Sequence, residues 1–473
     1  KNIIYVGALS ALLDIEPEVI AELIGEQYKG KEALLKPNVQ AMHMGRSYAQ
    51  NTLDYPLGIR VRRCNAVGER IFIEGNSAAA LGCVYGGATV AAWYPITPSS
   101  SLAEAFTKHC KKFRTDASGK ARYAIVQAED ELASIGMVIG AAWNGARAFT
   151  CTSGPGISLM QEFIGLAYFA EIPAVLFDVQ RGSPSTGMPT RTQQADMLSC
   201  AYASHGDTKH VLLMPEDPKE AFEFAALSFD LADRLQTPVF VMLDLDVGMQ
   251  DWLCEPLVWD DARRHDRGKV MTYEQLEAGK DFGRYLDVDG DGIAYRTYPG
   301  THPRKGSYFT RGTTKDRYAR YTEDGATYVD NMQRLLRKFE TAKQILPRPV
   351  RRNAAQPSRI GAIYFGSTSP AMDETLALLS AQSIYVNTLR VRAFPFHDDV
   401  ADFIAAHDHV FVVEQNRDAQ VRSMIVNELA VDPARLIAVL HYDGTPITAR
   451  FIAREIADRL ALFNVTPIRK AAS

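Results

Sequence analysis

Cysteine is scarce in this sequence and is not arranged to bind metal. The 473 residues include six cysteines, and no two of them are spaced as CxxC. This spacing excludes an iron–sulfur cluster or a structural zinc site built by the usual motifs from this chain alone. Scattered cysteines in apolar or mixed segments are typical of free thiols in a reducing compartment, so we expect a cytoplasmic protein. The six are Cys64, Cys83, Cys110, Cys151, Cys200 and Cys254.

Long apolar runs and an excess of positive charge are also missing. No stretch approaches the ~20 consecutive apolar residues that a membrane-spanning helix needs. The formal net charge of −4 gives no basic surface for nucleic acid and disfavours docking on an anionic membrane. Lys1 to Tyr5 lack the apolar run and cleavage site of a signal peptide, so we expect none. The composition, with 47% apolar residues, is that of a globular protein that can bury large cores.

Short apolar segments alternate with helical patterns between residues 66 and 255. The helical segments place apolar residues on one face, as Leu132, Ile135 and Ile139 do. This alternation predicts an α/β domain whose parallel sheet is covered on both faces and connected by right-handed crossovers. The expected strands are 70–73, 88–94, 123–127, 146–152, 174–179, 211–214 and 238–243.

The segment ahead of this domain, residues 1–65, has the pattern of a domain end. We expect a helix near 20–25 and short helical pieces over 30–48, because Pro, Asn and Gly interrupt that stretch.

Two segments follow the α/β domain. Residues 256–355 are polar, which predicts an extended insertion with a helix over 330–345 and a linker over 347–357. Residues 356–473 resume the alternation and predict a second, smaller α/β domain. Its expected strands are 360–365, 386–391, 410–414 and 437–440.

The segment Tyr94-Pro95-Ile96-Thr97-Pro98-Ser99-Ser100 lies where an expected strand ends and a helix begins. Ligands bind at that edge of open parallel sheets. Two prolines stiffen the turn, and its hydroxyls and the helix N–H groups could hold a carboxylate. The alternative is a rigid loop in which serines only cap the following helix.

Three acids, Glu129, Asp130 and Glu131, lie between the next strand and helix. They could simply complement the dipole of the helix in its first turn. The functional alternative needs only one of them. A carboxyl at a buried strand end could keep the raised pKa that a catalytic acid needs.

Glycine-rich turns follow the next two strands. Residues 150–160, TCTSGPGISLM, let the backbone approach a ligand closely, but they contain neither a P-loop nor a nucleophile elbow. Residues 179–191, VQRGSPSTGMPTR, include Arg181, which can bind a carboxylate bidentately, and Thr190, which can add a hydroxyl. The alternative for this second turn is a surface loop with solvated arginines.

Four motifs in order resemble those of 2-oxoacid:ferredoxin oxidoreductases: YPITPSS, QAEDELASIGMVIGA, TSGPGISLM and R-x-x-P-S-T-G-x-P-T. Residues 66–255 thereby resemble the pyrimidine-type thiamine-diphosphate-binding domain of the alpha-type subunit. Residues 356–473 resemble the transketolase-C-terminal-like α/β domain that follows it. Residues 1–65 resemble the C-terminal part of a gamma-type α/β domain that some members fuse ahead of it. The resemblance covers nearly the whole chain.

The resemblance implies roles for individual residues. Glu131 matches the acid that contacts the thiamine aminopyrimidine, with Glu129 as the alternative assignment. Thr97, Arg181 and Thr190 match the groups that hold the 2-oxoacid. The cofactor is also expected to meet Pro95, Ile96 and Gly154, and Arg191 to meet a distal substrate carboxylate.

The family's diphosphate site is not found in this sequence. It needs Gly-Asp-Gly and a metal-binding Asn in a strand–helix setting, whereas the Gly-Asp-Gly at 290–292 lies in the polar insertion. With no cluster-type cysteines either, the chain is expected to hold no metal itself. The resemblance then implies a beta-type partner that carries Gly-Asp-Gly, Mg²⁺ and a 4Fe-4S cluster, in a dimer of alpha–beta units.

Two weaker patterns are also expected to bind no metal. Asp287, Asp289 and Asp291 resemble half a calcium loop, but Tyr298 stands where that loop needs Glu, so we predict a solvated turn. His407 and His409 are spaced to share one face of a strand.

The implied reaction is oxidative decarboxylation of a 2-oxoacid to its acyl-CoA, with coenzyme A as co-substrate and electrons passed to ferredoxin. If the pool of electron carriers were sufficiently reducing, the reaction would run in reverse. The PSTGMPT loop and the fused gamma-type layout resemble the 2-oxoglutarate branch, with pyruvate or a branched-chain 2-oxoacid as alternatives. A different alternative is a non-catalytic assembly module that keeps a thiamine-enzyme fold.

Overall fold

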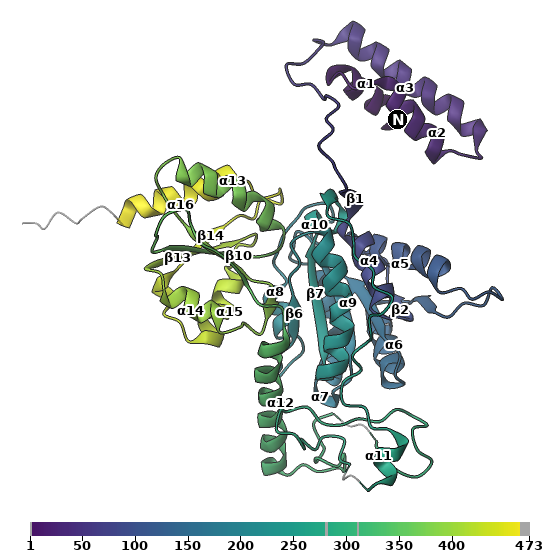
Figure 1. Ribbon diagram of the computed structural model, residues 1–473, viewed down its shortest axis with the longest axis vertical. Helices are drawn as coiled ribbons and strands as arrows, with labels where there is room; N and C mark the ends of the chain where they lie inside the picture. The colour runs from purple at the N-terminus through teal and green to yellow at the C-terminus, as the bar shows by residue number, and fades with distance from the viewer. Residues whose placement is uncertain (1, 280–281, 310–311, 464–473) are drawn as a thin grey trace, which may run out of the picture. The chain divides into compact units, whose positions relative to one another are not determined.

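The structure, a computed structural model, describes residues 2–279, 282–309 and 312–463 (Figure 1). The chain divides after Arg70 into two units, and the second contains both predicted α/β domains. Within the described ranges, no helix has the length and apolar character needed to cross a membrane.

The N-terminal unit consists of helices, and residues 2–70 contain no strand. α1 (Asn2–Leu12) packs so closely on α3 (Glu32–Thr52) that a Cβ at Gly7 would overlap the Met42 carbonyl. α2 (Pro17–Gln27) connects them. The prediction of short helical pieces over 30–48 is wrong, because this stretch belongs to one continuous helix. Pro37 cannot donate a backbone hydrogen bond, but packing on α1 stabilises the helix through it. The assignment of residues 1–65 to a gamma-type domain stays a prediction.

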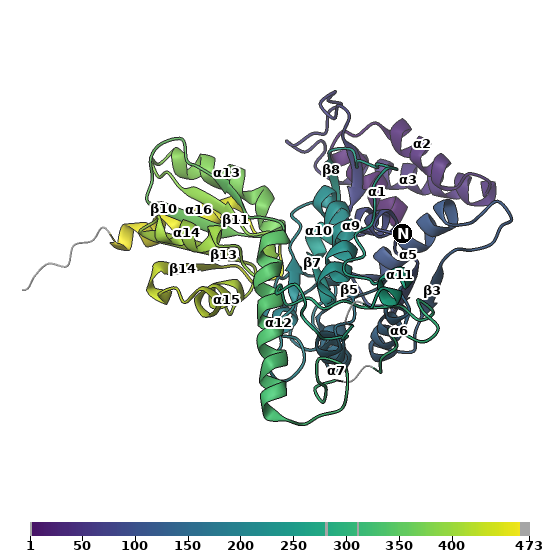
Figure 2. The same ribbon diagram turned by 60° about the horizontal axis from the view of Figure 1, so that its bottom comes forward.

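A seven-stranded sheet forms the centre of the second unit. Several of its strands and the helices around them can be followed in Figures 1 and 2. Its order is β12-β6-β7-β5-β4-β2-β3, and every pair except β12–β6 is parallel, which confirms the predicted α/β sheet. β5 and β7 are buried along their whole length, as apolar strands covered on both faces should be. The strands are β2 (Val90–Trp93), β3 (Ala124–Gln127), β4 (Ala148–Thr152), β5 (Ala174–Gln180), β6 (Val211–Leu213), β7 (Pro238–Asp244) and β12 (Ala393–Phe394).

The predicted strand at 70–73 forms, but outside this parallel sheet. β1 (Ile71–Glu74) pairs antiparallel with β8 (Asp251–Cys254) in a separate two-stranded sheet. The chain enters a helix directly at Gly75, where a Cβ would overlap the Val247 carbonyl. This close backbone contact holds β1 beside the segment that ends in β8. The four residues of β1 do not by themselves indicate this long-range pairing.

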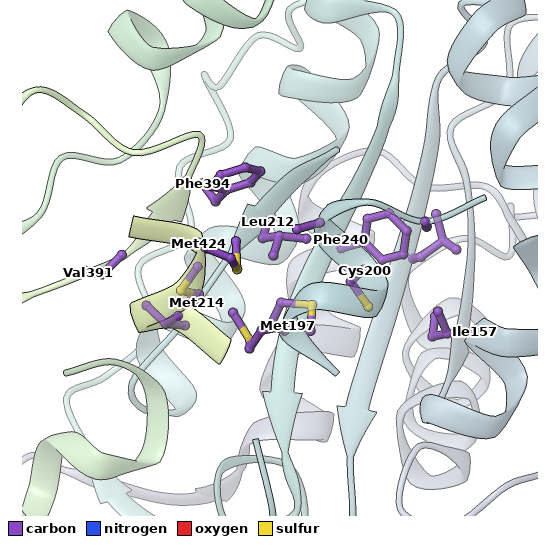
Figure 3. Packing of buried hydrophobic residues seen from close by; sticks show 14 of the residues in the cluster. Ile157, Met197, Cys200, Leu212, Met214, Phe240, Val391, Phe394 and Met424 are labelled. Atoms are coloured by element: carbon purple, nitrogen blue, oxygen red, sulfur yellow. The ribbon is translucent and has the colours of Figure 1, made fainter. Parts of the chain in front are cut away.

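Helices cover both faces of the sheet and enclose two apolar cores. One core contains residues of α6, α7 and α8, and the other contains residues of α4, α5 and α9. In the first core, Met197 and Cys200 lie near Phe240 of β7, and Met424 reaches it from the C-terminal domain (Figure 3). These helices are α4 (Gly75–Tyr85), α5 (Ser100–Phe113), α6 (Glu131–Trp143), α7 (Gly154–Ala170), α8 (Met197–Ala201), α9 (Pro218–Leu235) and α10 (Leu245–Met249).

The polar insertion carries α11 (Tyr273–Glu277) and ends in α12 (Gly325–Ile345), which begins earlier than predicted. Asp324 caps α12 by accepting a hydrogen bond of 2.8 Å from Thr327 N, so the helix gains its first turn. Buried ion pairs fix the insertion to the sheet domain, among them Arg296 with Asp233 at 2.8 Å.

The C-terminal domain is a five-stranded sheet of order β14-β13-β10-β11-β9, and its predicted α/β character is confirmed. The stretch expected to be only a linker contains β9 (Val350–Arg352), which pairs antiparallel with β11. β12 leaves this domain and pairs with β6 of the larger sheet. The other elements are β10 (Ile360–Tyr364), β11 (Asn387–Arg390), β13 (His409–Glu414), β14 (Leu436–Leu440), α13 (Ser369–Ser380), α14 (Asp399–Ala405), α15 (Gln420–Leu429) and α16 (Ala449–Phe463).

Candidate active site

The four motif loops leave four adjacent strands of the large sheet. β5, β4, β2 and β3 are neighbours, and all four run parallel. Because the carboxyl ends of parallel strands share one edge, the loops that follow these strands lie together there. This edge is the candidate active site.

The loop after β2 is held by hydrogen bonds to its own backbone. Ser99 does not cap α5 as predicted, since its backbone is already helical and its side chain makes no capping bond. The Ser99 and Ser100 hydroxyls instead donate to the Ile96 carbonyl, at 3.0 and 3.2 Å. Asn76 Nδ2 donates to the Pro98 carbonyl at 2.9 Å. Thr97 is exposed beside this fixed turn, together with Pro95.

The three acids after β3 have three different environments. Asp130 caps α6 by accepting a hydrogen bond of 2.7 Å from Ala133 N. Glu129 is exposed. Glu131 is buried, with 6% of its surface exposed. Asp130 is therefore the N-cap of α6, and Glu131, the acid in the first turn of the helix, is the buried one of the three.

Glycines let the turn after β4 approach the two neighbouring loops. A Cβ on Gly156 would overlap Thr152 Oγ1 and lie 2.8 Å from Glu131 Cγ. A Cβ on Gly154 would lie 2.7 Å from both carboxylate oxygens of Asp196. The Gly-Pro-Gly turn is thus packed between Glu131 on one side and Asp196 on the other.

Arg181 connects the loop after β5 to the loop after β2. Its Nη1 donates to the Thr97 carbonyl at 2.6 Å, and its Nη2 donates to the Thr186 carbonyl. Burial lowers the pKa of the Arg181 guanidinium, while the charge of Asp196 raises it. The side chain is only 4% exposed, so the solvated-arginine alternative is wrong for Arg181.

The end of this loop faces the C-terminal domain. Gly182 N donates to the Arg191 carbonyl at 2.8 Å, which closes the loop into a hairpin. Thr190 is exposed on it. Arg191 is also exposed, and its Cβ lies 3.0 Å from where a Cβ on Gly444 would be. The structure therefore brings Thr97 and Arg181 into contact, while Thr190 and Arg191 lie farther along the hairpin.

A buried acid pair at this edge was missed by the sequence reasoning. Asp178 of β5 and Asp196 before α8 are in side-chain hydrogen-bonding contact. Burial raises the pKa of Asp178 well above its usual range and that of Asp196 to about 6. Cys200 Sγ lies 3.6 Å from Asp178 Oδ2. The available signal was an acid in the otherwise apolar run 174–179.

The patterns expected to bind no metal have other partners. The turn at 287–292 is not simply solvated, because Lys269 Nζ lies 2.8 Å from Asp289 and 2.7 Å from Asp291. An ammonium group thus compensates the charge of its acids. His407 lies before β13 rather than on it, and its ring bonds Phe403 O and Asn387 Nδ2. In the described part of the chain, no three His, Cys, Asp or Glu residues are grouped to hold a metal ion.

Residues 81–340 match the family described as "Pyruvate flavodoxin/ferredoxin oxidoreductase, thiamine diP-bdg". The 2-oxoacid:ferredoxin oxidoreductase 2, subunit alpha, of Aeropyrum pernix is 33% identical over 464 residues, or 94% of this chain and 70% of that protein. The 2-oxoglutarate synthase subunit KorA of Methanocaldococcus jannaschii is 42% identical over 206 residues, or 44% of this chain and 50% of that protein.

Solved structures agree with these matches. The 2-oxoglutarate:ferredoxin oxidoreductase from Magnetococcus marinus, solved with 2-oxoglutarate, coenzyme A and succinyl-CoA bound, is similar with a TM-score of 0.81. It is 27% identical, and the alignment covers 97% of this chain and 77% of that one. The resemblance found in the sequence is therefore confirmed over both α/β domains. The chain belongs to the 2-oxoacid:ferredoxin oxidoreductase family, as an alpha-type subunit with a thiamine-diphosphate-binding domain.

Proposed function

We propose that this subunit catalyses oxidative decarboxylation of 2-oxoglutarate to its acyl-CoA, with electrons passed to ferredoxin. The observation that carries the proposal is the contact between Arg181 and the Thr97 carbonyl, at the sheet edge that also holds buried Glu131. The similarity to the KorA subunit and to the Magnetococcus marinus enzyme supports 2-oxoglutarate over pyruvate or a branched-chain 2-oxoacid.

Glu131 is proposed as the catalytic acid that meets the aminopyrimidine ring. The residue is 6% exposed, its Cγ packs against Gly156, and within the described residues no protein donor bonds its carboxylate. It is therefore available to hold a proton at a ring nitrogen. Thiamine diphosphate, when bound, would supply the carbanion and the electron sink that decarboxylation of a 2-oxoacid needs. Glu129 stays the alternative, but its exposure gives its carboxylate no protection from water.

Thr97, Arg181 and Thr190 are proposed to bind the substrate's carboxylate and keto groups. Arg181 already uses Nη1 and Nη2 on backbone carbonyls, and its Nε has no hydrogen-bond partner among the described residues. A guanidinium held in this way presents a fixed positive charge to an incoming carboxylate. Arg191 is proposed to meet the distal carboxylate of 2-oxoglutarate. Pro95, Ile96 and Gly154 are proposed to line the cofactor.

The rest of the site is proposed to come from a beta-type partner. In the described ranges of this chain, no side-chain cluster suits Mg²⁺ or a 4Fe-4S cluster. The partner would carry both, together with the Gly-Asp-Gly diphosphate site, in a dimer of alpha–beta units. Coenzyme A would be the co-substrate. The six free cysteines, five of them buried, support a reducing, cytoplasmic location.

Reduction of a low-potential dye by the copurified complex tests this function. Activity that needs coenzyme A is expected with 2-oxoglutarate, and less with pyruvate or 2-oxoisovalerate. Glu131→Gln and Arg181→Ala should each lower kcat/KM by about 100-fold or more. A complex that holds its cluster and thiamine diphosphate but oxidises none of the three acids would contradict the proposal and favour a non-catalytic assembly module.

A further inference from the structure

A buried pair of acids lies next to the arginine that is proposed to bind substrate. Asp178 is fully buried, Asp196 is 7% exposed, and their carboxyl groups are in hydrogen-bonding contact. Two carboxylates in contact away from water cannot both be ionised, because their charges repel and neither is solvated. The pair therefore holds one proton and one negative charge near neutral pH.

Neighbouring elements contribute the groups that surround the pair. Arg181, from the loop after β5, is the cation that interacts with Asp196. α8 contributes the Cys200 thiol, whose pKa is raised well above its usual range by burial, so it stays neutral and can donate to Asp178. The turn after β4 contributes the neutral Gly154, where an added Cβ would lie 2.7 Å from both carboxylate oxygens of Asp196.

Gln180 fixes Asp196 through the backbone. Its Oε1 accepts a hydrogen bond of 3.0 Å from Asp196 N, and its Nε2 donates to the Leu243 carbonyl at 3.1 Å. Asp178 Oδ1 and Asp196 Oδ2 are buried and accept no hydrogen bond from a protein donor among the described residues. Gln180 thus holds Asp196 in place without bonding its carboxyl group. The two carboxyl groups therefore keep the proton and the negative charge between them.

We propose that Asp178 and Asp196 share one proton and that the remaining negative charge holds the Arg181 guanidinium in place beside Thr97. This inference rests on the proposed function, in which Arg181 binds the 2-oxoacid. Both guanidinium hydrogen bonds go to backbone carbonyls, so the carboxyl pair supplies the compensating charge. A nearly buried guanidinium without that charge would turn toward water and leave the substrate loop. Asp178 and Asp196 are therefore positioning residues.

Infrared difference spectroscopy on the complex without substrate tests the shared proton. A carboxylic-acid band is expected at neutral pH, and Asp178→Asn should remove it. A second acid band should appear as the pH falls through about 6, where Asp196 takes up its proton. If Asp178→Asn kept the band, or if the parent showed no acid band at neutral pH, the shared proton would be ruled out. This result does not depend on whether the enzyme turns over.

Steady-state kinetics test the effect on Arg181. Asp196→Asn removes the charge, so KM for the 2-oxoacid should rise about 10-fold while kcat changes much less. In the parent complex KM should rise as the pH falls through about 6, and in Asp196→Asn this dependence should vanish. Asp178→Asn retains a donor toward Asp196, so it should rescue a KM close to that of the parent at neutral pH.

The matched control is Asp246→Asn. Asp246 is also 7% exposed and burial also raises its pKa to about 6, but the groups that act on it are Asp244, Gln250 and Thr192 rather than Arg181. Its KM should stay that of the parent. A parent-like KM and pH profile in Asp196→Asn would overturn the positioning role. A parent-like KM in Arg181→Ala would instead contradict the proposed substrate role of Arg181. The infrared result would then still show whether Asp178 and Asp196 share a proton.

Discussion

The Glu171 carboxylate lies 3.0 Å from the Lys338 ammonium, although 167 residues separate them. Glu171 follows α7, Lys338 belongs to α12, and both are almost fully buried. Arg334 of α12 adds a bidentate ion pair, with Nη1 at 3.0 Å and Nη2 at 2.5 Å from the Glu171 oxygens. These charges hold the pKa of Glu171 well below its usual range, against the effect of burial. One acid of the sheet domain thus attaches the last helix of the insertion.

Glu171→Gln should destabilise the protein by about 3–5 kcal/mol, because it leaves Arg334 and Lys338 buried without their counter-charge. The free energy of unfolding by urea measures this. Asp330→Asn is the matched control on α12, since its pair with Arg317 is about half exposed and should be worth about 0–1 kcal/mol. Equal losses in the two variants would show that burial does not set the strength of this pair.

The stability of the folded protein should fall in mild acid because of His210. This side chain is fully buried, and burial lowers its pKa from 6.5 to about 4. The unfolded chain takes up a proton on this residue below about pH 6.5 while the folded chain does not until about pH 4. The folded state therefore loses about 3 kcal/mol as the pH falls across that window and regains it as the pH rises.

His210→Phe should remove this pH dependence while keeping the edge-to-face ring contacts with Tyr168 and Phe240. It loses the hydrogen bond to the Ala203 carbonyl, which costs about 1 kcal/mol at every pH. Urea unfolding at about pH 7 and about pH 5 gives the difference. The control is His205→Gln, because the His205 side chain is 80% exposed. An unchanged slope in His210→Phe would assign the acid sensitivity to other groups.

Gly156→Ala should weaken cofactor binding by about 10-fold or more. The added methyl group would overlap Thr152 Oγ1 and push against Glu131, so the side chain that we propose as the catalytic acid would move. Titration of the apo complex with thiamine diphosphate measures the affinity. Gly140→Ala is the control, because it lies in α6 with no atom within 4 Å of the added Cβ. It should leave affinity unchanged and stabilise the helix by about 1 kcal/mol.

Asp130→Ala should cost about 1 kcal/mol of stability, because it removes the bond that caps α6. Glu129→Ala should cost little, since Glu129 is exposed and Asp130 is the residue that forms the cap. Thermal unfolding of both variants checks the difference. A larger loss for Glu129→Ala would mean that the cap is not the main role of Asp130.

The sequence by itself determined the parallel sheet and the edge at which its loops meet. Apolar runs of strand length that alternate with amphipathic helical segments are local patterns, and a parallel sheet requires both. The same patterns put Thr97, Glu131 and Arg181 directly after strands. Since parallel strands end at one edge, strand order was not needed to predict that these residues lie at the same side of the domain.

Only the tertiary structure decided how those residues are used. The neighbouring positions Glu129, Asp130 and Glu131 have the same chemistry, and burial and capping separate them only once α6 packs on the sheet. The pairing of β1 with β8 and the entry of β12 into the larger sheet join segments far apart in the chain, and the contact of Asp178 with Asp196 joins a strand to the end of the loop that follows it. Such contacts depend on which surfaces meet after folding, and no local pattern of residues records that choice.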